Sequence, residues 1–100
     1  MLKSKERAYL RGLANGFPAI FQVGKSGVTP ELSASVDSAL EARELVKLSV
    51  LENSMMSAKE AAEMISERTR SEIVQVIGNR FVLYRKSRKK PVIEFDGKKG

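Results

Sequence analysis

The residues best suited to chemistry form a short loop, Gly24-Lys25-Ser26-Gly27, between an apolar run and a helix-start signal. Two glycines let the backbone approach another molecule closely and adopt positive φ angles, and the lysine supplies a point charge that suits phosphate. The helix that Thr29 and Pro30 should open adds oriented N–H groups and a positive dipole end. The pattern predicts a clamp for a phosphate backbone, and the simpler alternative is a glycine turn between two elements.

Two known loops resemble this tetrapeptide, and their spacing distinguishes them. A P-loop, G-x-x-x-x-G-K-[ST], would need a glycine where the chain has Ala19, and Gly27 and Pro30 separate the Lys-Ser pair from the helix. We therefore exclude a nucleoside triphosphatase. The loop is similar instead to the GXXG loop that KH-type RNA-binding domains lay along nucleotides.

Composition argues against an enzyme. The chain of 100 residues has no cysteine and no histidine, which removes disulfides, thiolate zinc sites, cysteine nucleophiles and the commonest general base. Its carboxylates fall mostly at helical spacing among other charges, as on a solvated face, and nothing marks a buried catalytic pair. We expect no catalytic residue, no metal, no cofactor and no small-molecule substrate.

Charge is segregated along the chain, whose net value is +6. Residues 1–27 carry five basic and one acidic side chain, residues 28–84 carry six and nine, and residues 85–100 carry seven and two. A surface that needed only solubility would mix the two signs. The basic flanks indicate a polyanionic partner, either nucleic acid or an anionic membrane face, and the alternative is a tail that serves only solubility.

The sequence supports a membrane partner less than a nucleic acid. The N-terminus is charged and has no apolar segment of the signal-peptide kind, and no stretch approaches the ~20 apolar residues of a membrane span. No expected helix combines a large apolar stripe with aromatic anchors and a lysine-rich face, so a membrane-surface role is the weakest alternative. We expect a cytoplasmic protein without a membrane partner.

The elements that must position the loop follow from hydrophobic periodicity and turn signals. Helices are expected over residues 3–15, 30–42 and 58–68, and strands over 19–23, 44–51, 73–77 and 81–85, with a short edge strand over 92–95 and a frayed end over 96–100. Gly78-Asn79 should form a type II′ hairpin turn. The order α-β-α-β-α-β-β predicts an α+β or α/β two-layer sandwich, a four-stranded mixed sheet with three helices.

The strand expected over residues 44–51 alternates in polarity. Val46, Leu48 and Val50 should face the core, while Lys47 and Ser49 share the other face of the strand. The face that carries Lys47 and Ser49 is therefore expected to be at least partly exposed to solvent.

With these elements placed, the chain resembles the CRM domain, the YhbY-type RNA-binding family. Four segments carry the resemblance in the family's order: RGLA at 11–14, FQVGKSGV at 21–28, ELVK at 44–47 and VQVIGNRFVLYR at 74–85. The resemblance implies a fold like the C-terminal domain of bacterial translation initiation factor three, with RNA binding. For free-standing bacterial members it also implies association with ribosomal RNA in large-subunit precursors. It divides the chain into a single domain over residues 1–86 and a basic extension over 87–100.

Two positions depart from the family's pattern. Ser49 stands where a basic residue often follows the ELVK segment, and Asn79, followed by Arg80, stands where a basic residue usually follows the turn glycine. These departures affect the expected RNA footprint rather than the class of protein.

The candidate RNA contacts are loop or basic residues that should meet phosphates. They are Gly24, Lys25, Ser26 and Gly27 in the loop, Lys47 on the second strand, Arg7 and Arg11 on the first helix, and Arg85, Lys86, Arg88, Lys89 and Lys90 in the C-terminal segment. Residues 85–90 follow directly on the final strand and should leave the sheet close to where the hairpin ends. If they share the face of the loop with the first helix, all three regions form one electropositive surface.

The aromatic residues favour one mode of recognition. Phe17, Phe21, Phe81 and Tyr84 are expected in the core, so shape and phosphate readout of structured RNA is favoured over base-by-base readout of single strands. The alternative function is a protein-interaction module that docks acidic ribosome-associated partners through the basic flanks.

Overall fold

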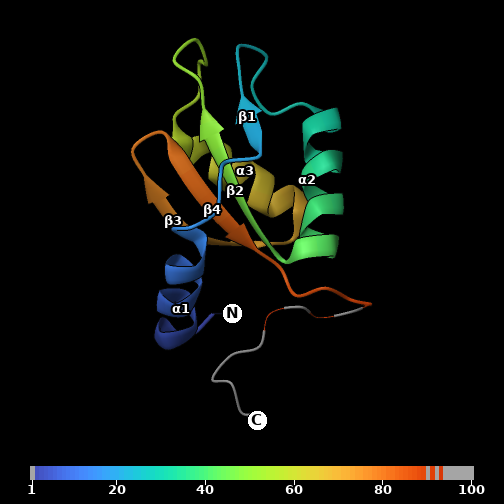
Figure 1. The fold of residues 1–100 in the computed structure, drawn as a ribbon. Helices are drawn as coiled ribbons and strands as arrows, with labels where there is room; N and C mark the ends of the chain where they lie inside the picture. The colour runs from blue at the N-terminus through green and yellow to red at the C-terminus, as the bar shows by residue number, and fades with distance from the viewer. Residues whose placement is uncertain (1, 90, 92, 94–100) are drawn as a thin grey trace.

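The computed structural model describes residues 2–89, 91 and 93, and within them three helices and four strands follow the predicted order (Figure 1). The elements are α1 Ser4–Ala14, β1 Phe21–Val23, α2 Pro30–Arg43, β2 Leu45–Val50, α3 Ala58–Thr69, β3 Glu72–Ile77 and β4 Arg80–Tyr84. Strand β1 begins at Phe21 rather than Ala19. The segments 92–95 and 96–100 lie outside the described residues, except for Ile93, which belongs to no strand.

The four strands form one mixed sheet in the order β1-β2-β4-β3. Strands β1 and β2 are parallel, whereas β4 runs antiparallel to both of its neighbours. Helices α2 and α3 cover one face of the sheet, and α1 lies against the other face at the end where β2 begins (Figure 1). The predicted four-stranded mixed sheet with three helices is confirmed.

The helix starts follow the predicted capping residues. The Thr29 hydroxyl accepts a hydrogen bond from the Leu32 N–H at 3.1 Å, with Pro30 in the first turn of α2. Ser57 and Glu60 form a capping box at the start of α3, with bonds of 3.1 and 2.9 Å. These side chains satisfy N–H groups that a first helical turn leaves without partners.

The β3–β4 hairpin turns at Gly78 and Asn79 as predicted. Gly78 has a φ of 58° and Asn79 does not have a positive φ, which is the type II′ pattern. The Val50 N–H donates to the Asn79 carbonyl at 2.7 Å, and the Asn79 amide donates back to the Val50 carbonyl at 3.2 Å. The hairpin is therefore tied to the end of β2.

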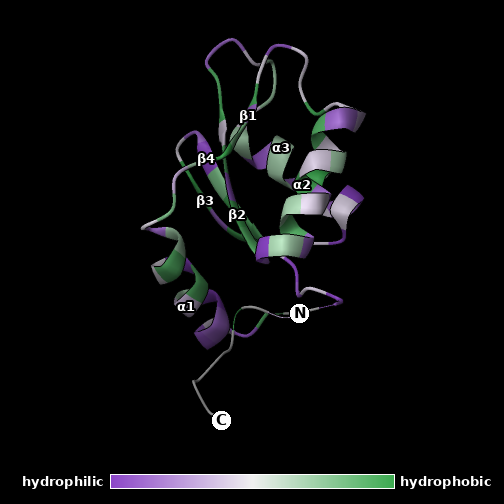
Figure 2. Cartoon of the chain, turned by 45° about the vertical axis from the view of Figure 1, so that its right-hand side comes forward, coloured by the Kyte–Doolittle hydropathy of each residue, from purple (hydrophilic) through white to green (hydrophobic). Residues whose placement is uncertain are grey.

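Two hydrophobic cores lie on opposite faces of the sheet. The larger core fills the space under α2 and α3 and includes Leu40, Leu48, Ile65 and Phe81, each at most 1% exposed. Small side chains on α3 let that helix approach the sheet closely. Figure 2 shows the apolar residues of the helices and strands gathered where these elements face each other.

The smaller core lies beneath α1. Leu10 and Ala14 of α1 pack against Leu45, Val82 and Tyr84 of the sheet. Burial raises the pKa of the Tyr84 phenol to about 12, and nearby carboxylates add to the shift. Because α1 reaches only the end of the sheet where β2 begins, the other half of this face stays uncovered.

The junction between α2 and β2 is built on a buried acid, Glu44. Its side chain is fully buried and its backbone has a φ of 68°, which ends the helix and turns the chain into the strand. The Arg85 N–H donates to the Glu44 carbonyl at 2.9 Å. The Glu44 carboxylate accepts the N–H groups of Ser87 and Ile93, both at 2.6 Å. Arg85, Ser87 and Ile93 are therefore held against the end of α2.

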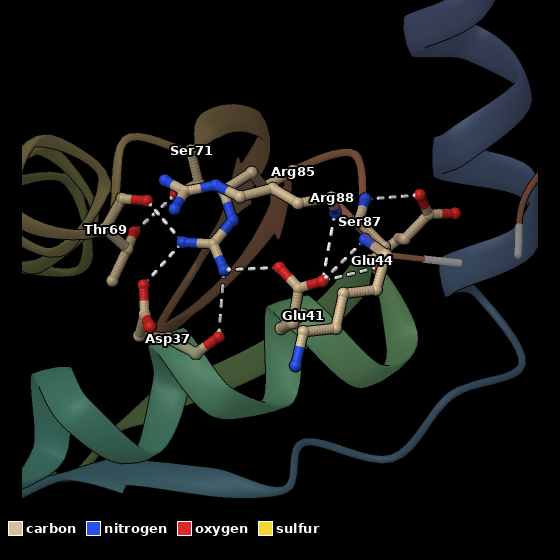
Figure 3. Close-up of polar contacts among 9 residues, drawn as sticks. Asp37, Glu41, Glu44, Thr69, Ser71, Arg85, Ser87 and Arg88 are labelled. Carbon is tan, nitrogen blue, oxygen red and sulfur yellow. Dashed lines mark hydrogen bonds and ion pairs between the residues drawn. The ribbon is translucent and has the colours of Figure 1, made fainter. Parts of the chain in front are cut away.

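Arg85 joins three elements from the end of β4 (Figure 3). Its guanidinium donates to the Thr69 carbonyl at 2.7 Å and to both the carboxylate and the carbonyl of Asp37. It also pairs with the Glu41 carboxylate at 3.5 Å. With only 10% of its side chain exposed, Arg85 acts as a link between β4 and the ends of α2 and α3.

Glu41 holds the backbone that follows Arg85. Its carboxylate accepts the Ser87 hydroxyl at 2.7 Å and the N–H groups of Arg88 and Lys89 at 3.0 and 3.2 Å. The hydroxyl bond from Ser87 and the two backbone bonds lower the pKa of Glu41 below its usual value, against a smaller opposing effect of desolvation. The segment after β4 is thus bound through its backbone.

Replacing Arg85 with alanine should lower the free energy of unfolding by about 1–3 kcal/mol, because the Thr69 carbonyl loses a charged donor in a largely buried position. Chemical denaturation followed by circular dichroism measures the change. The exposed neighbour provides the control, and Lys86→Ala should change stability by no more than about 0.5 kcal/mol. Equal stability of the two variants would contradict a structural role for Arg85.

Candidate nucleic-acid interface

The loop after β1 is a tight, exposed turn. The Gly27 N–H donates to the Gly24 carbonyl at 3.0 Å, which closes the turn and leaves Lys25 and Ser26 exposed at its tip. The loop stands beside the segment that follows β2, whose Leu51 N–H donates to the Val23 carbonyl at 2.9 Å. The segment after β2 therefore holds the base of this turn in place, and the side chains of Lys25 and Ser26 face solvent.

The two glycines of the loop have different structural roles. Gly27 has a φ of 71°, and a Cβ placed there would lie 3.2 Å from the Met56 sulfur. Gly24 has no such φ, and a Cβ there would meet only Leu51 at an ordinary 3.7 Å. Gly27 is therefore required by the fold, whereas Gly24 leaves room that an approaching phosphate backbone could use.

Lys47 lies on the uncovered half of the sheet, as the alternation of β2 predicts. Its ammonium donates to the carbonyls of Ala14 and Phe17, both at 3.2 Å. These carbonyls belong to the C-terminal end of α1 and the loop beyond it, where the helix dipole favours a cation. The charge is therefore held at a defined place over the sheet.

Arg80 completes the basic character of this face and was not among the predicted site residues. It lies directly opposite Ser49 on the neighbouring strand and is exposed. The family pattern often has a basic residue at position 49, and in this chain Arg80 of β4 places a positive charge next to that position. The turn signal at Gly78 predicts only that Arg80 pairs with Ile77 of β3, and its position beside the end of β2 comes from the order of the strands in the sheet.

Two cavities on the sheet face share the cations Lys47 and Arg80. One of about 300 Å³ extends toward the β3–β4 hairpin, and one of about 460 Å³ extends toward β1. Asn15, just after α1, lines both as well. Arg80 and the Gly24–Gly27 loop lie toward the same end of the sheet, because Val23 pairs with Val50 and Arg80 pairs with Ser49.

The two arginines of α1, Arg7 and Arg11, differ in burial and in their contacts. Arg7 is partly buried and its guanidinium donates to the Ile73 carbonyl of β3. Arg11 is exposed one turn later. Arg11 is therefore the better placed of the two for an external partner, and Arg7 already helps to hold α1 on the sheet.

The C-terminal basic segment leaves the sheet at the wrong end for the surface expected from the sequence. Tyr84 pairs with Leu45 at the start of β2, whereas Val23, just before the loop, pairs with Val50 at its end. The two ends of a six-residue strand lie about 17 Å apart. The segment leaves the sheet where the hairpin ends, as expected, but about one strand length from the Gly24–Gly27 loop, so the condition for one electropositive surface with the loop is not met.

The individual residues of that segment have separate environments. The Arg85 side chain is bound by Asp37, Glu41 and Thr69, whereas the side chains of Lys86, Arg88 and Lys89 are exposed. Lys90 lies outside the described residues. Among the described residues of this segment, Arg85 is therefore the cation that is largely buried. The exposed cations lie at the opposite end of the sheet from the Gly24–Gly27 loop.

The aromatic residues follow the expectation with one exception. Phe81 and Tyr84 are buried, and Phe21 packs against the larger core. Phe17 is 40% exposed and lies on the loop that crosses the sheet between α1 and β1. The expectation of a core position is wrong for Phe17, because the loop runs over the open face rather than into either core.

Neither a metal site nor a membrane span emerges from the residues that the structure describes. No three acidic, histidine or cysteine side chains gather among them in the way that a metal ion needs. Their helices also lack the combined length and apolar character needed to cross a bilayer.

Comparison with known proteins places the chain in a family. The family model of the CRS1 / YhbY (CRM) domain matches residues 2–85. This chain belongs to the CRS1/YhbY (CRM) domain family. The match includes every helix and strand of the described structure, so the CRM domain and the observed fold coincide.

Relatives of this CRM domain are similar over nearly their whole length. The Bacillus subtilis (strain 168) protein named "Probable RNA-binding protein YqeI" is 44% identical over 94 residues, covering 94% of this chain and 98% of that protein. A Haemophilus influenzae protein named "RNA-binding protein" is 31% identical over 86 residues, covering 86% and 87%. The solution structure of a hypothetical protein from Staphylococcus aureus is 48% identical with a TM-score of 0.78, covering 94% and 98%.

The different roles of the loop glycines in this CRM domain lead to a stability test. Gly27→Ala should lower the free energy of unfolding by about 1–2 kcal/mol, because alanine resists a positive φ and Met56 must move. Gly24→Ala should change it by no more than about 0.5 kcal/mol, since the position has room and ordinary backbone angles. Thermal denaturation of both variants measures the difference, and an equal or reversed order would contradict the assigned roles.

Proposed function

We propose that this CRM domain binds RNA through the Gly24–Gly27 loop and the adjoining open face of the sheet. The observation that carries the proposal is that Lys47 and Arg80 share the open face and that Arg80 lies toward the end of the sheet from which the loop extends. Lys25 is exposed at the loop tip, while Lys47 and Arg80 line the same two cavities on the face beside it. Cations beside a glycine loop suit the phosphates of a nucleic acid, which contribute most of its affinity for a protein.

The names of the relatives support RNA as the polyanion. Two proteins that are 44% and 31% identical to this chain are both named as RNA-binding proteins. We propose in addition that the ligand is ribosomal RNA in precursors of the large subunit, in the cytoplasm, because the sequence resembles free-standing bacterial members of the family. The role is assembly without catalysis, consistent with a site made of cations, amides and glycines.

A protein-docking module has weaker support. That alternative relied on the basic flanks, yet Arg85 is internal and Arg7 is tied to the Ile73 carbonyl. The carboxylates of Glu41 and Glu44 hold the backbone after β4 against the domain. The flanks are therefore used partly for the fold. On the open face Arg80 is exposed, and Lys47, although bonded to two carbonyls, keeps one N–H for an outside acceptor.

Gly24→Asp is the sharpest test of the loop. An aspartate there places a negative charge where a phosphate should lie, while the backbone angles at Gly24 tolerate a side chain. We expect RNA affinity to fall at least tenfold, with an unchanged circular dichroism spectrum. Fluorescence anisotropy with a labelled ribosomal RNA fragment measures the affinity, and Gly24→Ala is the matched control. Unchanged binding by Gly24→Asp would remove the loop from the site.

A charge-matched pair of variants tests which end of the sheet faces RNA. Lys25→Gln with Arg80→Gln should reduce the slope of log affinity against log salt by about 1.5 units, because two phosphate contacts are lost. Arg88→Gln with Lys89→Gln removes the same charge from the opposite end and should leave the slope nearly unchanged. Titrations at several salt concentrations give both slopes. An equal reduction in the two variants would contradict the assigned surface.

A further inference from the structure

Phe17 is the most unusual residue of the open face. It is 40% exposed in a chain whose other described phenylalanines pack into the core, and it stands on the wall between two cavities. The loop that carries it crosses the sheet beside Lys47, whose ammonium binds the Phe17 carbonyl at 3.2 Å. An exposed aromatic ring next to a fixed cation is the combination that holds a nucleotide's base and phosphate.

The cavity between this loop and the sheet has the lining that a nucleotide needs. Its volume is about 460 Å³, within the range of small-ligand sites. It combines the aromatic Phe17, the amide of Gln22, the hydroxyl of Ser49 and the cations Lys47 and Arg80. The Gln22 side chain projects from β1 next to Ser49, with which it is paired in the sheet.

Each group of this lining matches one part of a nucleotide. An amide carries both donor and acceptor atoms and can bond the edge of a base, as Gln22 and Asn15 are placed to do. The Lys47 ammonium has two carbonyl partners and retains capacity for a third acceptor, which a phosphate oxygen can fill. The guanidinium of Arg80 presents a planar fork that suits phosphate.

We propose that this cavity binds a single unpaired nucleotide of the RNA, with its base stacked on Phe17 and its phosphate between Lys47 and Arg80. The inference rests on the proposed RNA binding and specifies its ligand as an unpaired or bulged position beside structured RNA. A base inside a duplex is already stacked on both faces and has no free face to offer an aromatic ring. The ligand therefore has a phosphate backbone at the loop and one extruded base at Phe17.

Phe17→Leu separates stacking from simple apolar bulk. The test uses two labelled RNAs of equal length and similar charge, a hairpin with an unpaired loop and a continuous duplex. The parent protein should bind the hairpin more tightly than the duplex. Phe17→Leu should lose about fivefold or more in affinity for the hairpin, since one stacked base is lost, with little change for the duplex. Ile20→Ala, another exposed apolar residue outside this cavity, should affect neither RNA.

A tryptophan at the same position reports stacking directly. The chain contains no tryptophan, so Phe17→Trp introduces a single reporter that keeps an aromatic face. Its emission should be quenched by the hairpin and much less by the duplex, and hairpin affinity should be retained. This variant also keeps the test decisive if Phe17→Leu fails to fold.

The outcomes distinguish the two proposals. Loss of hairpin preference in Phe17→Leu, with quenching in Phe17→Trp, supports the nucleotide site. Parent-like binding of both RNAs by Phe17→Leu, or equal quenching by hairpin and duplex, overturns the nucleotide site and leaves RNA binding in place. Failure of the parent protein to bind either RNA overturns both.

Discussion

Strand β2 sets the constraint on which the open face depends. Its residues Val46, Leu48 and Val50 fill the core under α2 and α3, so the side chains between them must project from the opposite face. On that face α1 covers only the start of the strand, where Leu45 joins the smaller core. Lys47 therefore emerges at the border of α1, and a register shift of one residue would bury it and expose the core.

The end of α2 shows how charge is used to hold the fold together. Glu41 and Glu44 place two carboxylates at a helix C-terminus, where the dipole disfavours negative charge. Backbone N–H groups after β4 offset this cost by donating to both carboxylates, and the guanidinium of Arg85 pairs with the Glu41 carboxylate. The same contacts anchor residues 85–89 and connect β4 to α2, so a segment rich in basic residues is partly structural (Figure 3).

The two ends of the sheet differ in the elements that they carry. The end where β2 begins carries α1, the smaller core and the Glu44 junction, all of which stabilise the domain. The end where β2 finishes carries the Gly24–Gly27 loop, the hairpin turn and the cavities around Arg80. Packing at the first end leaves the second free for a partner. In this chain Arg80 stands opposite Ser49, so the cation at this place on the face comes from β4.

The sequence by itself determined the elements, the mixed sheet, the capping residues, the hairpin turn and the face on which Lys47 lies. These follow from local rules, since periodicity, caps and turn glycines act over a few residues. Which cations share a surface was decided only by tertiary structure. Arg85 is internal, Arg80 joins Lys47 across the sheet, and Phe17 is exposed because of how the strands pair and where the α1–β1 loop crosses. Strand order and direction bring together residues distant in the chain, and no local pattern contains that information.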